Sequence, residues 1–499
     1  MPTLSSVAEI AVKESSTVNT DVKQEISLPQ IIQGGMGIGI SHWKLAREVS
    51  LTGQLGVVSG TAIDNVLARR LQNGDFDGLM RTAMQHFPDQ EIISRILKKF
   101  FIAGGKAKDR PFVAVPKLSV VQNSRSQELL VVSAFVEVWL AKQDHDGQVG
   151  INFLHKIQMA NGAAILGAIM ADVDYILMGA GIPREIPQFI VDLLSGDVAK
   201  MVIEVKDAPD PVTVSVYPKD FFGGAKIELK RPKFLAIISS EILASYLVRG
   251  EGAHPDGFVI ETDQAGGHNA PPRGKLTLDE SNEPIYGVRD IANLEKMRTL
   301  GLPFWLAGGY GKPEMLTSAI KEGAAGIQVG TLFAMSEDSG FAPHLRSELL
   351  AKAHNLELAI HTDVKASPTT FPIKIVDLEN STSSLETFAA RTKLCDLGYL
   401  RSPVQLASGR IDYRCAGEPE GMYVKKGGDL DDTLGRKCLC NGLMANIGLG
   451  QHRLSGYDEP PLVTLGSEIE GIAEMQVRHN GLWSSKDVVA YLLGKVHMS

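Results

Sequence analysis

The sequence predicts an α/β protein built on a (β/α)8 TIM barrel. Eight short apolar runs recur between residues 29 and 331, each ends in Gly, Ser, Asn or an acid, and many precede a helix-like stretch. Buried parallel strands with crossover helices have this pattern, and eight such strands close economically into a barrel. An open doubly wound sheet is the main alternative, which is disfavoured because no early strand carries a full G-x-G-x-x-G pattern. The predicted strands are residues 30–33, 55–59, 149–153, 175–178, 235–239, 258–261, 304–306 and 326–329.

Helical patterns follow most of these strands. The first follows Ser41, which we expect to cap it, and the last has Pro313 near its first turn, where proline is tolerated. The spacing of strands and helices supports βα units. The predicted helices are residues 43–51, 159–170, 186–194, 241–248, 291–300 and 313–321.

Two segments interrupt the βα rhythm. Residues 61–147 form an insertion with helical stretches at 63–71, 91–101 and 127–141, and we expect it to cap the pocket. Residues 212–229 alternate on both sides of a Gly-Gly turn, which predicts a β-hairpin at the pocket rim.

The predicted domain division has three parts. Residues 1–28 read as a tail, residues 29–394 as the barrel with its insertion and hairpin, and residues 395–499 as a C-terminal extension that contains all four cysteines. Helices are expected beyond the barrel at 345–353 and at 485–493.

Composition narrows the class of partner. The 499 residues are 44% hydrophobic and 22% charged, with a formal charge of -8 and no Lys/Arg block. This balance argues against nucleic acid or an anionic membrane as the main partner, and a small-molecule substrate is expected. The sequence shows no spanning segment and no signal-peptide pattern, so a cytoplasmic location is expected. Oligomeric state is not indicated.

Glycines follow the first predicted strand in the segment 33–39, QGGMGIG. Glycines at a strand end let the backbone approach a flat ring or a phosphate without a Cβ in the way, although a tight turn without a ligand is an equal alternative. Gly34, Gly35 and Met36 are therefore candidate ligand contacts.

The sixth predicted strand leads into the strongest motif, ETDQAGGH at residues 261–268. His268 follows two glycines in the loop where barrels keep their catalytic residues. A histidine in such a cavity can remove a proton from carbon, because its pKa lies near neutrality. The alternative is a histidine hydrogen-bonded within its loop.

Two more glycine motifs follow strands seven and eight: LAGGYG at 306–311 and GIQVGT at 326–331. Barrels often bind phosphate with these two loops, where backbone N–H groups face the anion. A purely structural use of the glycines is the alternative.

Taken together, AGGH, AGG-x-G and GIQVGT resemble the nitronate monooxygenase family, also called 2-nitropropane dioxygenase-like proteins, which is related to the FMN-dependent enoyl-acyl carrier protein reductases. The resemblance covers roughly residues 29–380, including a segment at 367–374, SPTTFPIK. It implies an FMN cofactor and assigns contacts residue by residue. The implied FMN contacts are Gly34, Gly35, Met36, Asn152, Glu261, Gly266 and Gly267 around the ring, and Gly308, Gly309, Gly330 and Thr331 at the phosphate with Gln328 nearby.

The resemblance also implies an activity. The first hypothesis is that the protein oxidises a nitronate or related carbon acid with O2. His268 would then remove the α-proton of a neutral nitroalkane, a step that a preformed nitronate does not need. An NAD(P)H-dependent enoyl or quinone reductase, with an acyl-carrier-linked substrate as one version, is the alternative on the same scaffold. A flavin-binding scaffold protein is a third hypothesis, and His268 argues against it.

The four cysteines, Cys395, Cys415, Cys438 and Cys440, all lie in the extension. Four thiolates suffice for a zinc ion or an iron–sulfur cluster, and a reducing cytoplasm disfavours a structural disulfide. Their spacing matches no standard Cys-x-x-Cys pair, so buried thiols that bind no metal are the alternative.

Overall fold

The computed structural model describes residues 28–121 and 123–495. The predicted tail at residues 1–28 therefore lies outside the described residues, except for Leu28.

Eight parallel strands close into a barrel. Their order is β1-β10-β9-β8-β7-β4-β3-β2, and a parallel bridge between Ile32 and Leu55 joins the last strand back to the first. The (β/α)8 prediction is confirmed, and closure excludes the open doubly wound sheet. All eight predicted strands are present, as β1 (Ile31–Gln33), β2 (Gly56–Ser59), β3 (Val149–Leu154), β4 (Tyr175–Gly179), β7 (Lys233–Ile238), β8 (Gly257–Glu261), β9 (Phe304–Ala307) and β10 (Gly326–Val329).

Side chains fill the interior of the barrel. Alternate strand residues, including Val57, Leu177, Leu235, Val259 and Trp305, form one buried apolar cluster. Successive residues of a strand point to opposite faces, so their neighbours pack outward against the helices. The barrel is a packed core with its open space at one end, where ligands bind in this fold.

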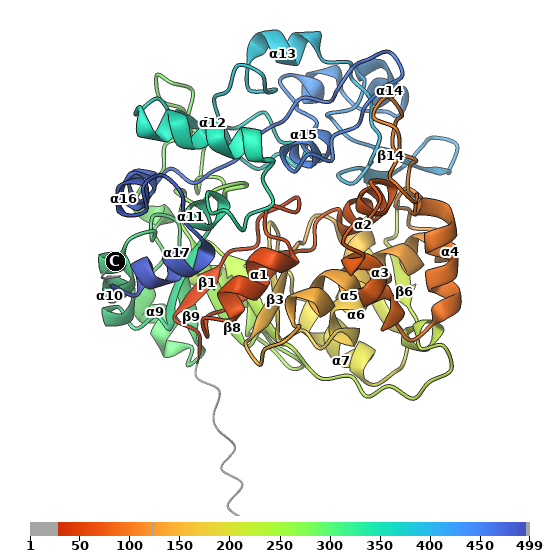
Figure 1. Ribbon diagram of the computed structural model, residues 1–499, viewed down its shortest axis with the longest axis horizontal. Coiled ribbons are helices and arrows are strands. Elements are labelled where there is room, and N and C mark those ends of the chain that lie inside the picture. Colours follow the sequence, from red (N-terminus) through yellow and green to blue (C-terminus); the bar gives the residue numbers. More distant parts are fainter. Residues whose placement is uncertain (1–27, 122, 496–499) are drawn as a thin grey trace, which may run out of the picture.

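Helices surround the barrel, and the last helix of the described residues is one of them. α17 (Ser485–Leu492) contacts α1 and α10, and so occupies the place that a helix directly after β10 would fill (Figure 1). The extension thus contributes to the barrel wall. The other surrounding helices are α1 (Trp43–Ser50), α5 (Ser124–Ala141), α6 (Gln158–Met170), α7 (Ile186–Leu194), α8 (Glu241–Leu247), α9 (Leu294–Thr299) and α10 (Pro313–Lys321).

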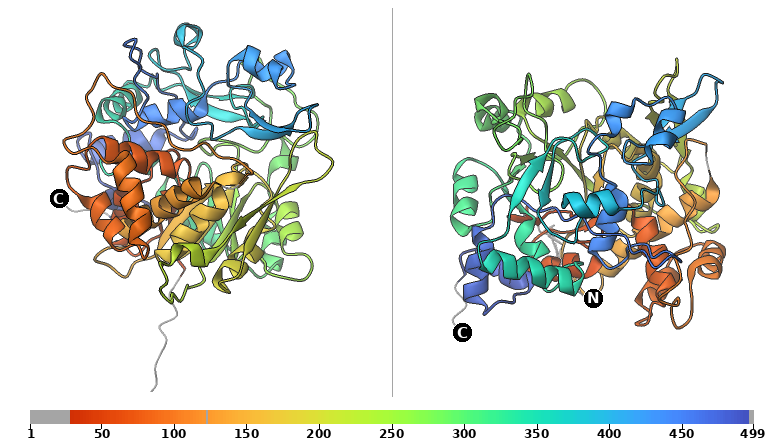
Figure 2. Two further views of the ribbon diagram at one scale, coloured as in Figure 1. Left: turned by 90° about the vertical axis from the view of Figure 1, so that its right-hand side faces the viewer. Right: turned by 90° about the horizontal axis from the view of Figure 1, so that it is seen from above.

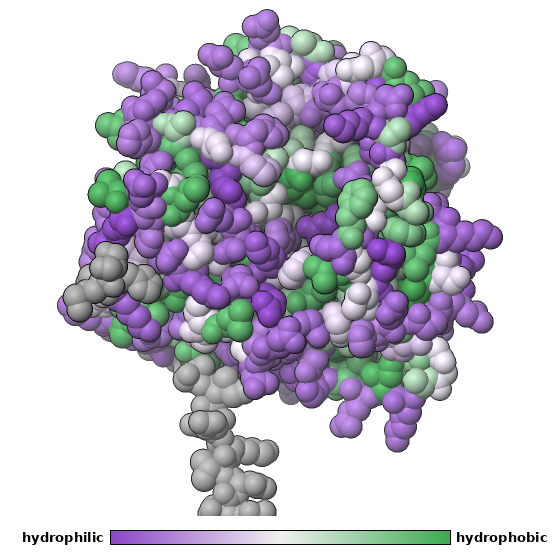
Figure 3. Space-filling view, in the orientation of Figure 1, coloured by the Kyte–Doolittle hydropathy of each residue, from purple (hydrophilic) through white to green (hydrophobic). Residues whose placement is uncertain are grey.

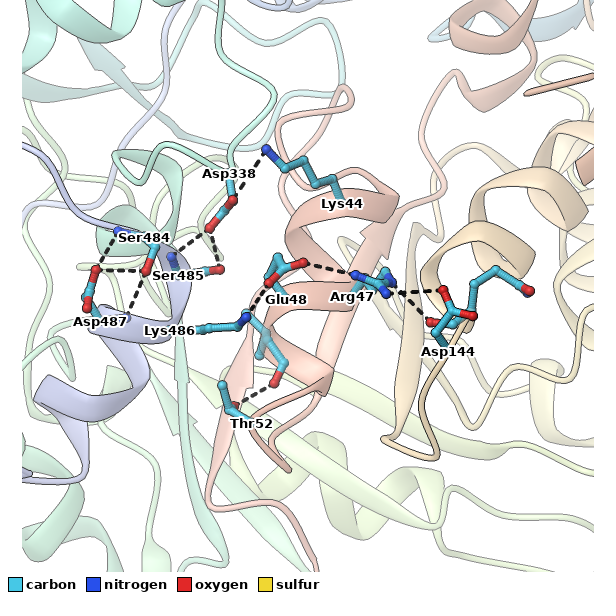
Figure 4. A network of polar contacts seen from close by, with 12 residues as sticks. Lys44, Arg47, Glu48, Thr52, Asp144, Asp338, Ser484, Ser485, Lys486 and Asp487 are labelled. Atoms are coloured by element: carbon cyan, nitrogen blue, oxygen red, sulfur yellow. Dashed lines mark hydrogen bonds and ion pairs between the residues drawn. The ribbon is translucent and has the colours of Figure 1, made fainter. Parts of the chain in front are cut away.

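Polar contacts attach α17 to α1. Lys486 pairs with Glu48 at 2.8 Å, and Asp338 accepts hydrogen bonds from the backbone N–H and the hydroxyl of Ser485 (Figure 4). Lys44 lies 3.6 Å from the other Asp338 oxygen. These contacts join the start, middle and end of the chain.

The predicted cap of α1 is wrong by one residue. His42 is the N-cap, and its Nδ1 accepts from the N–H of Lys44 at 3.0 Å. The Ser41 hydroxyl instead accepts from the N–H of Met36 at 2.7 Å, because the glycine turn folds back over it.

The insertion does not cap the pocket. It contains α2 (Ile63–Gln72), α3 (Leu79–Gln85), which the sequence pattern did not indicate, and α4 (Gln90–Phe100). Its last helix, α5, packs on α6 and α1 and serves as the crossover helix between β2 and β3. Of the insertion, only Thr61 lines the cavity at the strand ends.

The predicted hairpin at residues 212–229 is also wrong. β6 (Val212–Val216) pairs antiparallel with the preceding β5 (Ala199–Ile203). The strand ends where Pro218 opens the 3-10 helix η1 (Pro218–Phe221), since proline lacks the N–H that a continuing strand would use. The two glycines at 223–224 lie in the turn after η1 and join no strands.

The segments after β10 form a layer over the carboxyl ends of the strands. Coloured cyan to blue, they cross the middle of the molecule in the view from above (Figure 2). This layer replaces the insertion as the cover of the pocket. Its elements are α11 (Thr331–Ala334), α12 (Pro343–His354), β11 (Ile360–Asp363), β12 (Ile373–Val376), α13 (Leu385–Ala390), β13 (Ser402–Gln405), β14 (Ile411–Arg414), α14 (Glu420–Lys425), η3 (Leu430–Thr433), α15 (Leu439–Asn446) and α16 (Glu470–Arg478).

Within the described ranges, no helix has both the length and the apolarity needed to cross a membrane. Polar residues cover most of the face seen in Figure 3, with apolar residues in small groups between them.

Candidate active site

A cavity of about 1490 Å³, counting its open mouth, lies at the carboxyl ends of the barrel strands. Loops after β1, β3, β4, β8, β9 and β10 supply its walls, together with residues of the cover. Every predicted cofactor contact and the predicted catalytic histidine line it. They are Gly34, Gly35, Met36, Asn152, Glu261, Gly266, Gly267, His268, Gly308, Gly309, Gln328, Gly330 and Thr331.

The glycine turn after β1 forms one wall. Gly34 donates to the carbonyl of Val329 at 2.9 Å, which ties the turn to β10. A Cβ on Gly35 would lie 2.2 Å from the Cβ of Asn152, and Asn152 Nδ2 donates to the carbonyl of Gly35 at 3.2 Å. Glycine is required at position 35 because no side chain fits against Asn152.

Three half-buried polar side chains, those of Asn152, Glu261 and Gln328, form a group beside this wall. Gln328 Nε2 lies 3.5 Å from Glu261 Oε1, at the outer limit of a hydrogen bond. Asn152 Oδ1 and Gln328 Oε1 are buried and have no partner within the chain. Buried polar atoms are normally hydrogen-bonded, so these two oxygens mark where a ligand would donate.

Glu261 is the ionisable member of the group. Burial raises the pKa of Glu261 to about 7. The carboxyl is therefore part protonated at neutral pH and can donate as well as accept.

The glycine loops after β9 and β10 form the opposite end of the cavity. Gly308 and Gly309 have φ values of +84° and +78°, and a Cβ on either would lie 2.4 Å from a side-chain oxygen of Thr262 or Gln264. The loop after β9 therefore presents backbone atoms to the cavity at these two positions. Thr331 Oγ1 accepts from the N–H of Gly466 at 3.0 Å, which brings the cover against this end.

His268 lies in the loop after β8, and its Nε2 is 2.6 Å from the hydroxyl of Ser367. Its ring meets Phe371 edge-on, with ring centroids 6.4 Å apart. Burial lowers the pKa of His268 to about 4, so the imidazole is neutral at physiological pH. In the neutral tautomer whose Nε2–H donates to the Ser367 hydroxyl, Nδ1 is free to accept a proton.

The sequence motifs missed the contribution of the cover. Leu443 and Asn446 of α15 line the cavity, as do Leu465, Gly466 and Glu468 before α16. None of them belongs to a recognisable motif, and the length of the extension was the only signal. The segment at residues 367–374 is part of the family resemblance, but the sequence did not predict that its Ser367 contacts His268.

The four cysteines lie together beside a second cavity, which α15 connects to the first. All of them line this small cavity within the cover, and all are free thiols. Among the residues that the structure describes, no three His, Cys, Asp or Glu side chains are arranged to hold a single metal ion. The predicted zinc ion or iron–sulfur cluster at the four cysteines therefore stays a prediction.

No protein-family model matches the chain. Over 124 residues it is 26% identical to a Staphylococcus aureus (strain JH9) protein named "Probable nitronate monooxygenase", a match that covers 25% of this chain and 34% of that protein. The chain resembles nitronate monooxygenases, as its motifs predicted. The match spans about a third of the length of these curated relatives.

Solved structures give weaker likenesses. FabK from Thermotoga maritima covers 94% of this chain and 93% of its own, at 14% identity and a TM-score of 0.44. A nitroalkane oxidase from Streptomyces ansochromogenes covers 70% and 78%, at 15% identity and a TM-score of 0.35.

Proposed function

We propose that this protein is an FMN-dependent oxidoreductase that oxidises a nitronate or a related carbon acid with O2. The observation that carries the proposal is the gathering of four separate glycine-rich motifs and His268 around one cavity at the strand ends. The similarity to named nitronate monooxygenases supports the same reaction class.

The residues present fit FMN. One of the unpartnered oxygens of Asn152 and Gln328 would accept from the single N–H group of the oxidised isoalloxazine ring, and the Gly34–Gly35 backbone offers a surface without side chains. Backbone N–H groups of the loops at Gly308 and Gly330 would hold the phosphate. When bound, FMN supplies the electron-accepting group and the route to O2.

His268 accepts the proton that the α-carbon of the substrate loses. In a neutral nitroalkane the α-carbon is the acid, and Nδ1 of the neutral imidazole takes its proton while Ser367 holds Nε2. A preformed nitronate has already lost that proton, so its oxidation depends on positioning alone. His268 therefore separates the two substrates.

Apolar side chains beside His268 favour a substrate with an apolar chain. Leu154, Ile237 and Ile373 line the cavity, and Ile373 forms a β-bridge with His268. Burying an apolar group there contributes about 25 cal/mol for each Å² removed from water.

Anaerobic mixing of the FMN-loaded protein with propane-2-nitronate, NADH and NADPH in separate experiments tests the proposal. We expect the nitronate to bleach the flavin absorbance, and aerobic turnover to release nitrite. Bleaching by a nicotinamide alone would instead assign the reductase reaction. Failure to take up FMN at all would overturn the proposal.

A further inference from the structure

The four cysteines reach the second cavity from separate parts of the cover. Cys395 lies beyond α13, Cys415 directly follows β14, and Cys438 and Cys440 cap and begin α15. They are the only cysteines in the 499 residues. All four line one small cavity, which is a specific arrangement rather than scattered burial.

The arrangement differs from that of a single-ion site. Zinc draws four sulfurs to about 2.3 Å from one point, so the sulfurs crowd together. No such grouping exists in the described ranges, although the four thiols share one cavity. A cubane cluster has the opposite requirement, because each sulfur binds a different corner and the cluster occupies the space between them.

Basic side chains lie near the thiols, together with the acidic side chains of Asp396 and Glu418. Lys117 reaches the Cys395 segment, where its Nζ donates to the carbonyl of Cys395 at 3.1 Å. Arg401 lines the same cavity as the four cysteines. Arg391 pairs with Glu459 through Nε, and its Nη2 is buried without a partner. Such cations would balance a thiolate cluster of net negative charge.

The surrounding fold also needs a cross-link. Between α13 and α15 the regular structure is a two-stranded sheet of four-residue strands, one short helix and one 3-10 turn. Loop-rich segments with little regular structure are commonly held by a metal centre.

We infer that Cys395, Cys415, Cys438 and Cys440 bind a [4Fe–4S] cluster that holds the cover together. The cluster arrives preformed on low-molecular-weight thiolate ligands. Each cysteine S–H releases its proton, its thiolate forms one Fe–S bond, and the thiolate that it displaces leaves the iron and takes up a proton. The oxidation state of the cluster does not change. The cluster lies near the proposed flavin site. α15 begins at the cysteines, and its Leu443 and Asn446 line the active-site cavity, about 4.5 and 9 Å along the helix from Cys440 at 1.5 Å per residue.

Iron and acid-labile sulfide analysis of the full chain, purified and reconstituted without oxygen, tests the inference. We expect about four iron atoms and four sulfides per chain, with an EPR signal after dithionite reduction. One zinc per chain without iron, or a chain without either metal, would overturn it. FMN content is measured in the same sample, so failure of the cluster is distinguishable from failure of the proposed function.

Two variants assign the ligands. Cys415→Ser and Cys440→Ser should each lose most of the iron, whereas Ser408→Ala, at an exposed loop of the same part of the cover, should keep it. Circular dichroism checks that each variant is folded. Full iron content in a folded double variant C415S/C440S would show that these sulfurs are not ligands.

Discussion

At the scale of single residues, the surroundings of His268 set its chemistry. Its ring is buried and held by Ser367, and its pKa is lowered to about 4 by burial. The neutral form is therefore the resting form, and it persists well below the usual histidine pKa.

His268→Asn should slow the oxidation of neutral 2-nitropropane by about 10²- to 10⁴-fold, the usual contribution of a general base. Oxidation of propane-2-nitronate should change little, because no proton has to be removed. Steady-state nitrite release with both substrates measures the two effects on one preparation. Equal losses with both substrates would show that His268 does not act as the base.

Glu261 predicts a pH dependence of FMN binding. Its pKa is raised to about 7 by burial, so the buried carboxyl ionises as the pH rises through 7. An uncompensated buried charge beside the flavin should weaken binding above that pH. Quenching of FMN fluorescence between about pH 5 and about pH 9 measures the dissociation constant.

Glu261→Gln should flatten this profile, while Glu386→Gln, at a surface position, should leave it unchanged.

The raised pKa of Glu261 also makes the stability of the fold depend on pH. The folded protein binds this proton more tightly than the unfolded chain, so the stability contributed by Glu261 is present below about pH 4.5 and is lost as the pH rises towards 7.

At the scale of elements, the turn after β1 requires glycine at position 35. Gly35→Ala places a Cβ 2.2 Å from Asn152, so the turn or the asparagine must move. We expect FMN affinity to fall by at least tenfold, which calorimetric titration measures. Gly421→Ala, in a helix with open space around it, is the matched control and should preserve affinity. Unchanged affinity in Gly35→Ala would show that the turn does not contact the cofactor.

Helix α17 should contribute strongly to stability. Leu492 is buried against the barrel, so Leu492→Ala should lower the free energy of unfolding by about 2–5 kcal/mol. Lys495→Ala, just beyond the helix and exposed, should change it by less than about 0.5 kcal/mol. Urea unfolding followed by circular dichroism measures both, and equal effects would mean that α17 is not part of the cooperative core.

At the scale of the whole molecule, the sequence predicted the barrel and the residues that lie at the carboxyl ends of its strands. All eight strands are short apolar runs, and burial of such runs in a parallel sheet depends on local pattern. Glycine motifs at strand ends could be grouped because the carboxyl ends of barrel strands meet at one face.

Long-range pairing could not be predicted in the same way. β6 alternates as expected, yet its partner is β5, which precedes it by a loop, rather than the segment after the glycines. The contact of Ser367 with His268 and that of Gly466 with Thr331 join parts of the chain far apart in sequence. No periodicity encodes such contacts, since they depend on how the cover settles on the barrel.

The position of α17 has a consequence for biosynthesis. β1 and α1 leave the ribosome early, but the helix that packs between α1 and α10 is made only when translation has passed Leu492. Until then the nascent polypeptide leaves uncovered the part of the barrel wall on which Val488, Val489 and Leu492 are buried. We expect this uncovered surface to attract chaperones during synthesis and to aggregate in prematurely terminated products.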